Sequence, residues 1–348
     1  MTGIPPRYWT AMSRISLSLL AAALLTSCSD ETTETPSGSG VPDTATDTAV
    51  TPDVPPEDTT VADTEVPVDL EQWPEQPPTS VGGDRPAQLF VPSDYTRERE
   101  YPLVLLLHGY GAGALAQNAY LGVSAFVDEL DFVLVVPDGT QDDGGRRFWN
   151  ATPACCDFNG ENVDDVGYLS GLAEEVMAGV RIDSGRVYSF GHSNGGFMSY
   201  RLACDRSDLF SAIASLAGAS FSDESLCQPA TLPVSVLQIH GTLDDTIEYD
   251  GGATVVGRDY AYPSAQSSVE IHAELAGCDT DAAVAGENLD TENTIPGDET
   301  TTLTWDAGCA AGVNAALWTI VEGSHIPSIN PEGTQLVLEW LLSHDRTP

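Results

Sequence analysis

The pentapeptide Gly191-His192-Ser193-Asn194-Gly195 stands where a predicted β-strand ends and a predicted α-helix begins. Before it, Arg186 to Phe190 has the pattern of a short strand, and after it Phe197 to Asp205 carries apolar residues at helical spacing. A strand that leads directly into a helix brings the two backbones close together, so the residues two before and two after the serine must be small. Both are glycine. The sequence therefore predicts a tight strand–turn–helix unit with Ser193 at the turn.

A serine in this context is typical of the nucleophile of an α/β-hydrolase, in which an acid and then a histidine follow it along the chain. The serine hydroxyl needs a base to take its proton and an acid to orient that base. The apolar run from Leu232 to Ile239 predicts a buried parallel strand, and Asp244 lies in the loop that follows it. Asp244 is the preferred acid, with the adjacent Asp245 as the alternative, because spacing alone does not separate them. The other interpretation is that both are solvated loop acids.

The base is chosen by elimination among six histidines. His325 follows a predicted last strand, Ala315 to Val321, and precedes a predicted closing helix from about Glu332 to Ser343. This topological place indicates the base, and a histidine of the core or surface is the alternative. The others lie at strand ends, beside the serine, in a predicted helix or in the tail: His108, His192, His240, His272 and His344. The predicted catalytic residues are therefore Ser193, Asp244 and His325.

A glycine-rich turn, His108 to Gly113, follows the hydrophobic strand that ends in Leu107. Glycines in such a turn let backbone N–H groups face the oxyanion of a tetrahedral intermediate. The predicted donors are the amide of Tyr110 or Gly111 and the amide of Asn194, which follows the serine. A plain tight turn is the alternative.

Several stretches match one known group of proteins. They are Leu107-His108-Gly109-Tyr110-Gly111, Phe148-Trp149-Asn150 with Cys155-Cys156, Val163 to Leu169, the serine pentapeptide, and His240 to Asp244. Over roughly residues 85 to 343 the chain resembles secreted esterases such as polyhydroxybutyrate depolymerases, feruloyl esterases, acetylxylan esterases and LpqC-like lipoproteins. The resemblance implies one catalytic α/β-hydrolase domain and the same three catalytic residues. Many relatives follow the histidine with Thr-Trp-Pro-Gly, whereas Ile326-Pro327-Ser328 follows His325, so an aromatic wall of the substrate pocket is replaced here.

Two other pairs of residues receive roles from their position. Trp149 and His192 are assigned to substrate binding, and for Trp149 packing of the cysteine-bearing loop is an equal alternative. Asp164 and Asp165 precede a predicted helix from Val166 to Val180. At least one of these two carboxylates is therefore expected to cap the helix.

The first 80 residues differ from the rest of the chain. Arg14, the apolar run Ile15 to Leu25 and a cysteine at position 28 resemble a lipoprotein signal peptide, which implies removal of residues 1–27 and a lipid on Cys28. Such a lipid would hold the protein on a membrane. Residues 28–80 are rich in Thr, Pro, Asp and Glu and lack basic residues. They cannot bury enough apolar surface to offset the entropy of ordering, so the sequence predicts a disordered acidic tether.

Residues 81–348 have the size of one domain. Their alternating strand and helix patterns predict the α/β class, with a mostly parallel sheet covered by helices on both faces. Apart from Cys28 there are six cysteines, an even number that indicates three disulfides in an exported chain. The expected pairs are Cys278 with Cys309, Cys204 with Cys227, and Cys155 with Cys156, although exchange among the last four stays open.

The formal net charge of -40 excludes nucleic-acid binding by an ordinary electrostatic route. No metal or organic cofactor is expected, because there is no Cys-x-x-Cys pair and the acidic segment Asp279 to Thr301 lacks a recognisable calcium loop. The expected partners are an ester substrate, small or polymeric, and the membrane that receives the lipid of Cys28. A monomer is expected.

Together these features predict an exported, membrane-anchored serine carboxylic ester hydrolase. The candidate substrates are short hydroxyalkanoate esters and feruloyl or acetyl groups on polysaccharide. One alternative is a serine peptidase of the same fold. The other is a non-catalytic surface lipoprotein that binds polymer.

Overall fold

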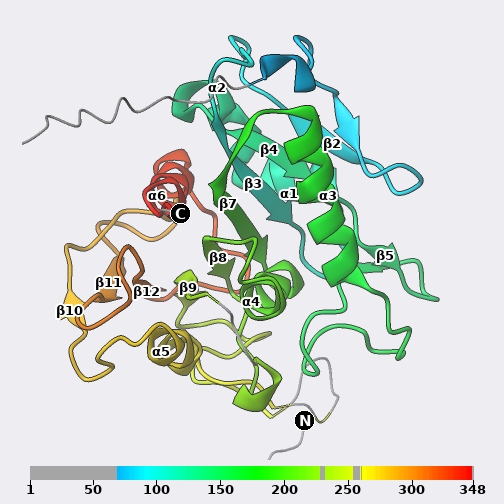
Figure 1. Cartoon of the computed structure of the whole chain (residues 1–348). Coiled ribbons are helices and arrows are strands. Elements are labelled where there is room, and N and C mark those ends of the chain that lie inside the picture. Colours follow the sequence, from blue (N-terminus) through cyan, green and yellow to red (C-terminus); the bar gives the residue numbers. More distant parts are fainter. Residues whose placement is uncertain (1–68, 228–231, 254–258, 260, 347–348) are drawn as a thin grey trace, which may run out of the picture. The chain divides into compact units, whose positions relative to one another are not determined.

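The computed structural model describes residues 69–227, 232–253, 259 and 261–346 (Figure 1). The predicted signal peptide, Cys28 and the predicted tether up to residue 68 lie outside the described residues. Within the described ranges, no helix is both long and apolar enough to cross a membrane. The centre of the described fold is a ten-stranded sheet in the order β1-β2-β4-β3-β7-β8-β9-β12-β11-β10.

The strands of the sheet are β1 (Ser80–Val81), β2 (Ala87–Phe90), β3 (Tyr101–Leu107), β4 (Val133–Val136), β7 (Ile182–His192), β8 (Ala212–Leu216), β9 (Ser235–Gly241), β10 (Val284–Ala285), β11 (Thr300–Trp305) and β12 (Ala315–Ile320). A separate hairpin joins β5 (Thr140–Gln141) and β6 (Arg147–Phe148). The helices are α1 (Ala114–Leu121), α2 (Val127–Leu130), α3 (Asp165–Gly179), α4 (Asn194–Asp205), α5 (Ala265–Leu275) and α6 (Pro331–Leu342). Short 3-10 turns are η1 (Leu70–Gln72), η2 (Val123–Phe126) and η3 (Glu224–Leu226).

The six central strands, from β4 to β12 in sheet order, are parallel, and the pairings outside them are antiparallel. Parallel strands are buried on both faces, which explains why β3 is one continuous apolar run with every residue buried. The prediction of a mostly parallel sheet is confirmed.

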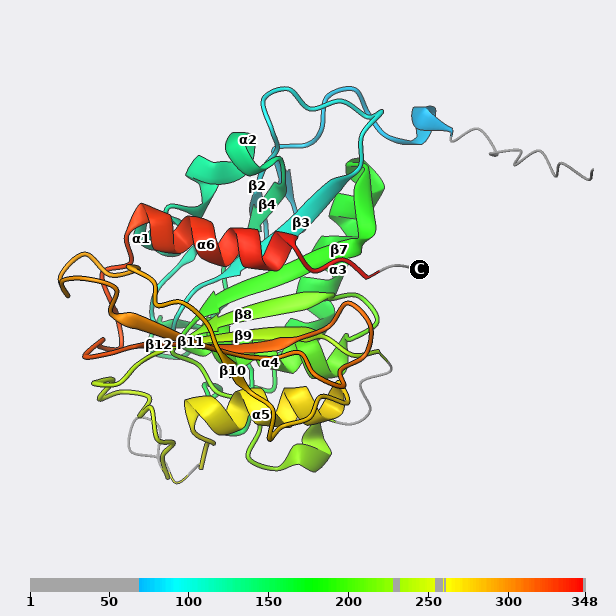
Figure 2. The ribbon, with the colours of Figure 1, turned by 90° about the vertical axis from the view of Figure 1, so that its left-hand side faces the viewer.

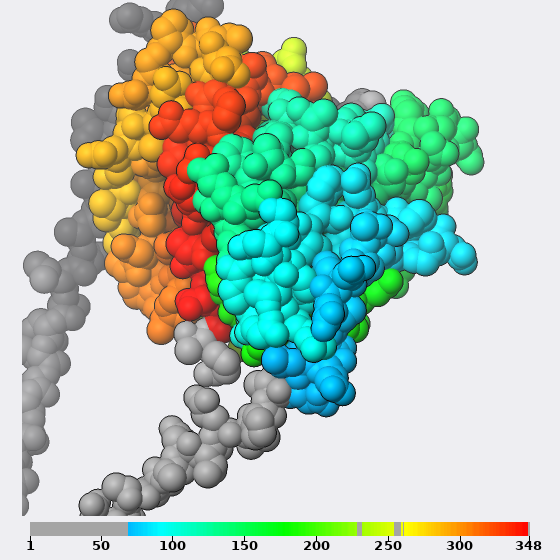
Figure 3. Space-filling view, turned by 90° about the horizontal axis from the view of Figure 1, so that it is seen from above, coloured from blue at the N-terminus to red at the C-terminus, as the bar shows by residue number. Residues whose placement is uncertain are grey.

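Alternate residues of the central strands face different helices. In β3, Leu103 and Leu105 lie in the core with α3 and α4, whereas Val104 and Leu106 lie in the core with α1, α2 and α6. Figure 2 shows α5 and α6 on opposite faces of the sheet. In the space-filling view, α6 (red) lies between the orange segment that carries β10 and β11 and the blue-green residues of α1, η2 and α2 (Figure 3). Helices therefore cover both faces, as predicted.

The parallel strands bring four loops to one edge of the sheet. The carboxyl ends of parallel neighbours lie at the same edge, which is where open α/β sheets bind ligands. The loops after β3, β7, β9 and β12 begin at His108, Ser193, Thr242 and Val321. The glycine turn, the serine and the loops that carry the predicted acid and base are therefore neighbours in space.

The expected boundary of the disordered tether at residue 80 is wrong. Residues 69–80 are ordered and pack on the domain. The indole Nε1 of Trp73 donates a hydrogen bond to the carbonyl of Met177 at 3.1 Å, and the Arg181 guanidinium lies 5.5 Å from the centre of its ring. The first bulky apolar side chains after the acidic segment give this part of the chain surface to bury, so the domain begins before β1.

The three expected disulfides are present: Cys155–Cys156, Cys204–Cys227 and Cys278–Cys309. Within the described ranges, Cys204, Cys227 and His272 are the one group of histidine, cysteine or acidic side chains close enough together to hold a metal ion. Two of its three ligand atoms are the sulfurs of the Cys204–Cys227 disulfide, so this group is a disulfide beside a buried histidine.

Five of the histidines are buried in this fold, among them His108, His192 and His272. Burial lowers the pKa of each of these three to about 4. In the unfolded chain a histidine takes up its proton near pH 6.5, roughly the ordinary pKa of a solvated imidazole. Between these pH values the unfolded chain therefore binds more protons than the native protein, and the free energy of unfolding decreases as the pH falls.

Replacing one of these histidines is expected to remove its share of this pH dependence. His272→Gln keeps a hydrogen-bonding side chain near Ser220, which His272 contacts at 3.1 Å, but it cannot take up a proton. Urea unfolding measured between about pH 6.5 and 4 should give a slope that is lower by about 1.4 kcal/mol per pH unit in the variant. An unchanged slope would show that His272 does not titrate on unfolding.

Candidate active site

The turn at Ser193 is as tight as the sequence predicts. Ser193 has φ 53° and ψ −118°, a strained conformation for a residue other than glycine, and its amide donates to the carbonyl of Leu216 at 2.7 Å. A Cβ atom at Gly191 would collide with the carbonyl of Gly195, and one at Gly195 would collide with the carbonyl of Leu107. The two glycines therefore allow β7, α4 and β3 to meet at this point.

Three side chains from three loops form one hydrogen-bonded array. Ser193 Oγ lies 3.0 Å from His325 Nε2, and His325 Nδ1 lies 2.8 Å from Asp244 Oδ2. Asp245, the alternative acid, is exposed. The structure thus brings together the three residues chosen from the sequence and places Asp244, not Asp245, beside the histidine.

The Asp244 carboxylate is buried yet well supplied with hydrogen-bond donors. Its Oδ1 accepts from the amides of Thr246 at 2.9 Å and Ile247 at 2.8 Å, and its Oδ2 faces both His325 and His240. Burial on its own would raise the pKa of Asp244, but the hydrogen bonds from His240, His325 and the backbone outweigh it and hold the pKa well below its usual range. Asp244 is therefore ionised at any pH at which the protein would work.

Neighbouring side chains fix the loop that carries His325. His192 Nε2 donates to the backbone carbonyl of His325 at 2.9 Å, and the Tyr120 hydroxyl donates to the carbonyl of Pro327 at 2.7 Å. The buried Glu292 accepts from the amide of Ser328 at 2.7 Å. Glu292 lies in the acidic segment Asp279 to Thr301, and composition alone gives no reason to single it out among so many carboxylates.

The prediction that the amide of Gly111 is an oxyanion donor is wrong. The amide of Gly111 donates to the carbonyl of Arg147 at 2.8 Å, so it is committed to closing the glycine turn. The predicted oxyanion donors are therefore the amides of Tyr110 and Asn194. The side chain of Asn194 is held by two hydrogen bonds with the backbone of Trp149, at 2.7 and 2.9 Å, which fixes the start of α4.

The assignment of Trp149 to substrate binding is also wrong. Its side chain is completely buried, and its Nε1 donates to the carbonyl of His108 at 3.0 Å. The ring packs against the His108 ring with 4.9 Å between centres. Trp149 therefore packs against the glycine turn and supports it, which is close to the alternative role of packing the cysteine-bearing loop. His192, by contrast, lines the pocket.

The helix-capping prediction is confirmed for Asp164, whose carboxylate accepts from the amide of Gly167 at 2.8 Å at the start of α3. Asp165 has a different role. It is buried, pairs with Arg85 at 3.0 Å, and accepts from the amide of Asn150 at 2.8 Å. This pair ties the loop that carries Trp149 to the body of the domain.

A pocket of about 440 Å³ opens beside Ser193 and His325. Its lining residues come from the glycine turn, α1, the Cys155–Cys156 loop and the loops after β7, β9 and β12, and none of them is acidic, lysine or arginine. They are Gly109, Tyr110, Ala112, Ala116, Gln117, Tyr120, Cys155, Cys156, His192, Ser193, Thr246, Ile247, His325 and Ile326. A volume of this size suits a small organic group, within the range of roughly 300–1,000 Å³ that is usual for ligand pockets.

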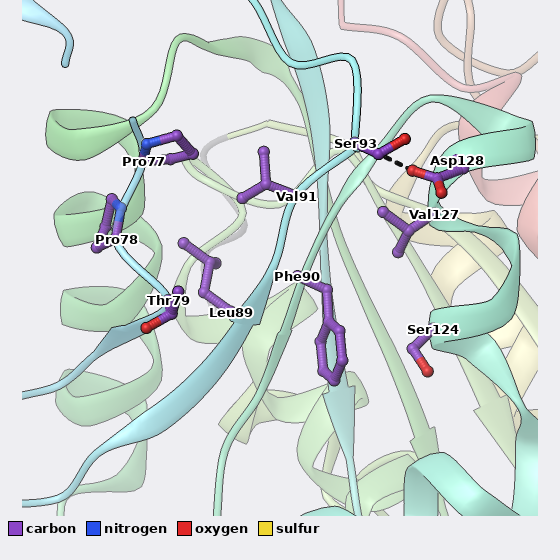
Figure 4. Close-up of a pocket in the computed structure, with 10 residues that line it drawn as sticks. All are labelled: Pro77, Pro78, Thr79, Leu89, Phe90, Val91, Ser93, Ser124, Val127 and Asp128. Carbon is purple, nitrogen blue, oxygen red and sulfur yellow. Dashed lines mark hydrogen bonds between the residues drawn. The ribbon is translucent and has the colours of Figure 1, made fainter. Parts of the chain in front are cut away.

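A second hollow, of about 370 Å³, lies away from this array between β2 and α2 (Figure 4). Prolines and aliphatic side chains make up half of its ten lining residues, and its one carboxylate, Asp128, accepts a hydrogen bond from the amide of Ser93 at 2.7 Å. It holds no nucleophile–base pair, so the chemistry belongs to the pocket at Ser193.

Two known proteins with similar sequences have names that describe esterases. "Putative esterase NocK" of Nocardia uniformis subsp. tsuyamanensis is 31% identical over 186 residues, which are 51% of this chain and 52% of that protein. "Feruloyl esterase B" of Piromyces equi is 28% identical over 257 residues, which are 72% of this chain and 44% of that protein. The chain thus spans about half the length of the curated relatives it matches.

Among solved structures, an acetyl xylan esterase from Aspergillus awamori aligns with a TM-score of 0.55 at 15% identity, over 76% of this chain and 98% of that chain. At this identity the likeness concerns the fold, and it confirms the predicted α/β-hydrolase architecture. The model of the family described as "Putative esterase" matches residues 79–274, which is more than half of the chain and includes Ser193 and Asp244. The chain therefore belongs to this esterase family.

Proposed function

We propose that this protein is a serine carboxylic ester hydrolase and that Ser193, His325 and Asp244 are its catalytic triad. The observation that carries the proposal is the continuous array from Ser193 Oγ through His325 to Asp244, with hydrogen-bond distances of 3.0 and 2.8 Å, at the mouth of an uncharged pocket. Membership of the esterase family supports the same reaction class.

The geometry supplies each step of ester hydrolysis. Ser193 Oγ attacks the carbonyl carbon while His325 Nε2 takes its proton, and Asp244 orients His325 and stabilises its charged form. The amides of Tyr110 and Asn194 hold the oxyanion. His325 returns the proton to the leaving alcohol, which departs and leaves an acyl group on Ser193. Water, activated by His325, then releases the acid and restores the serine.

The favoured substrates are feruloyl or acetyl esters on polysaccharide. Relatives whose names include feruloyl esterase support this class, and the apolar pocket with two tyrosines, Tyr110 and Tyr120, has room for an aromatic acyl group. Short hydroxyalkanoate esters are the second candidate, because the same apolar lining accepts an aliphatic acyl group. The serine peptidase alternative is less favoured. A peptidase that binds the free amine of its substrate would need carboxylates for it, and no lining residue of the pocket carries one.

We further propose that the protein is exported, cleaved from its signal peptide before Cys28, and anchored through lipid on that cysteine. The leader sequence supports this location, and so do three disulfides, which persist in oxidising compartments. The acidic tether between Cys28 and the domain would let a monomeric enzyme reach polymer beyond the membrane surface.

The triad assignment predicts different effects for two adjacent aspartates. Ser193→Ala should abolish hydrolysis of p-nitrophenyl acetate and butyrate, and Asp244→Asn should lower kcat by about a thousand-fold or more. Asp245→Asn is the matched control and should retain wild-type kinetics, because Asp245 lies outside the array. Thermal unfolding of all three variants checks that each one folds.

Either of two results would contradict this assignment. One is steady hydrolysis by folded Ser193→Ala, and the other is a greater loss in Asp245→Asn than in Asp244→Asn. A fluorophosphonate probe separates an enzyme from a binding protein, because a reactive serine is labelled and an inert one is not. Absence of label on the folded wild type would favour the non-catalytic surface lipoprotein.

Filling the pocket should alter the preference for the acyl group. Ala116 on α1 lines the pocket, and Ala119 on the same helix is exposed outside it, so the two positions allow the same substitution. Ala116→Phe should lower kcat/KM for methyl ferulate by about tenfold or more while p-nitrophenyl acetate changes little, because the added ring occupies acyl space. Ala119→Phe should change neither. A panel with acetylated xylan and hydroxybutyrate oligomers identifies the preferred substrate, and equal effects of the two variants would show that the acyl group lies elsewhere.

A further inference from the structure

A second histidine faces the Asp244 carboxylate. His240 is the penultimate residue of β9, and its side chain is 1% exposed. Its Nε2 lies 3.2 Å from Asp244 Oδ2, the same oxygen that His325 Nδ1 approaches at 2.8 Å, and 2.8 Å from the carbonyl of Ile247. One imidazole nitrogen of His240 thus touches both ends of the turn from Asp244 to Ile247.

The position of the His240 proton follows from Gln238. The Gln238 amide nitrogen lies 2.8 Å from the carbonyl of Gly218, which only accepts, so the amide orientation is fixed, and its oxygen accepts from the Tyr200 hydroxyl at 2.9 Å. The same amide nitrogen lies 3.0 Å from His240 Nδ1 and donates to it. Nδ1 therefore carries a lone pair, and the proton of His240 lies on Nε2, directed at Asp244 and Ile247.

We propose that His240 is a positioning residue for the triad, which holds Asp244 Oδ2 toward His325 by donating from Nε2. The inference rests on the proposed function, because His240 touches neither Ser193 nor the pocket. It adds a buried chain from Tyr200 through Gln238 and His240 to the carboxylate, all on or beside the central strands.

The hydrogen bond from His240 also changes how strongly the Asp244 carboxylate acts on His325. A donor on Oδ2 withdraws negative charge that would otherwise act on His325 alone. Without it, the full charge of the carboxylate acts on His325, and the charged form of His325 gains stability. Among the residues that the structure describes, the other titratable groups that face the two histidines are Tyr249, whose ring lies 5.7 Å from that of His240, and His192, whose ring lies 5.3 Å from that of His325. The Ser193 hydroxyl also faces His325.

The test compares two substitutions of His240 in the otherwise unchanged enzyme. His240→Phe keeps a ring but removes the donor, and His240→Gln places an amide N–H near the position of Nε2. His240→Phe should lower kcat for p-nitrophenyl butyrate by about ten- to a hundred-fold, with KM within about twofold, since a hydrogen bond to a charged group is lost. The acid limb of its pH–rate profile should move to higher pH. His240→Gln should recover most of the activity and the wild-type acid limb.

Tyr249→Phe is the matched control. It keeps the ring against His240 and loses only a hydroxyl that lies 2.8 Å from Thr319 Oγ1, so it should behave as wild type. If His240→Phe does not fold, His240→Asn replaces it, because the shorter amide cannot reach Asp244. Rates are expressed per serine labelled by fluorophosphonate, which corrects for inactive protein.

The inference is overturned if the variant without the donor keeps wild-type kcat. It is also overturned if that variant and His240→Gln lose activity equally with the acid limb unmoved, because packing alone would then explain the loss. Failure of the proposed function looks different: the wild type would hydrolyse no ester, or Ser193→Ala would remain active, and the inference would fall with it.

Discussion

The close approach of three backbones at Ser193 is the constraint on which the site depends. α4 starts directly after β7 and passes next to the end of β3, and side chains at Gly191 or Gly195 would collide with neighbouring carbonyl groups. This junction holds Ser193 at φ 53° and fixes the amide of Asn194 at the helix start. The buried Trp149, bound to both Asn194 and His108, fills the space beneath the junction and links it to the glycine turn.

Electrostatics in the site contrast with the rest of the molecule. The chain has a formal net charge of -40, yet the pocket lining contains no acidic side chain. One carboxylate, Asp244, lies behind the lining, where two backbone amides and two imidazoles approach it. A buried charge with this many donors is stable in one orientation, which is what a fixed proton-transfer path from Ser193 to His325 requires.

Much of the site could be predicted from the sequence, because a strand–turn–helix serine and the order of acid and base are local or topological signals. Asp244 and Asp245 could not be separated, since only the three-dimensional turn shows which one faces His325. The errors at Trp149 and Gly111 have one cause: sequence position shows that a residue is near the site but not whether its polar groups are already paired. Glu292 acts on Ser328, which lies in a segment far along the chain, and no spacing rule reveals such a contact. His240 lies only four residues before Asp244, but spacing does not show that its ring turns toward the carboxylate. The predicted tether is too long because it includes Leu70 and Trp73, the first bulky apolar residues after the polar segment.

The covalent intermediate tests the central claim most directly. Wild-type protein is mixed with p-nitrophenyl butyrate, quenched in acid within the first turnovers, and analysed by intact-mass and peptide mass spectrometry. The proposed mechanism predicts a mass increase of one butyryl group in place of one proton, located on the peptide that contains Ser193 and absent from Ser193→Ala. Ester hydrolysis without an adduct on Ser193, or with the adduct on another residue, would contradict it.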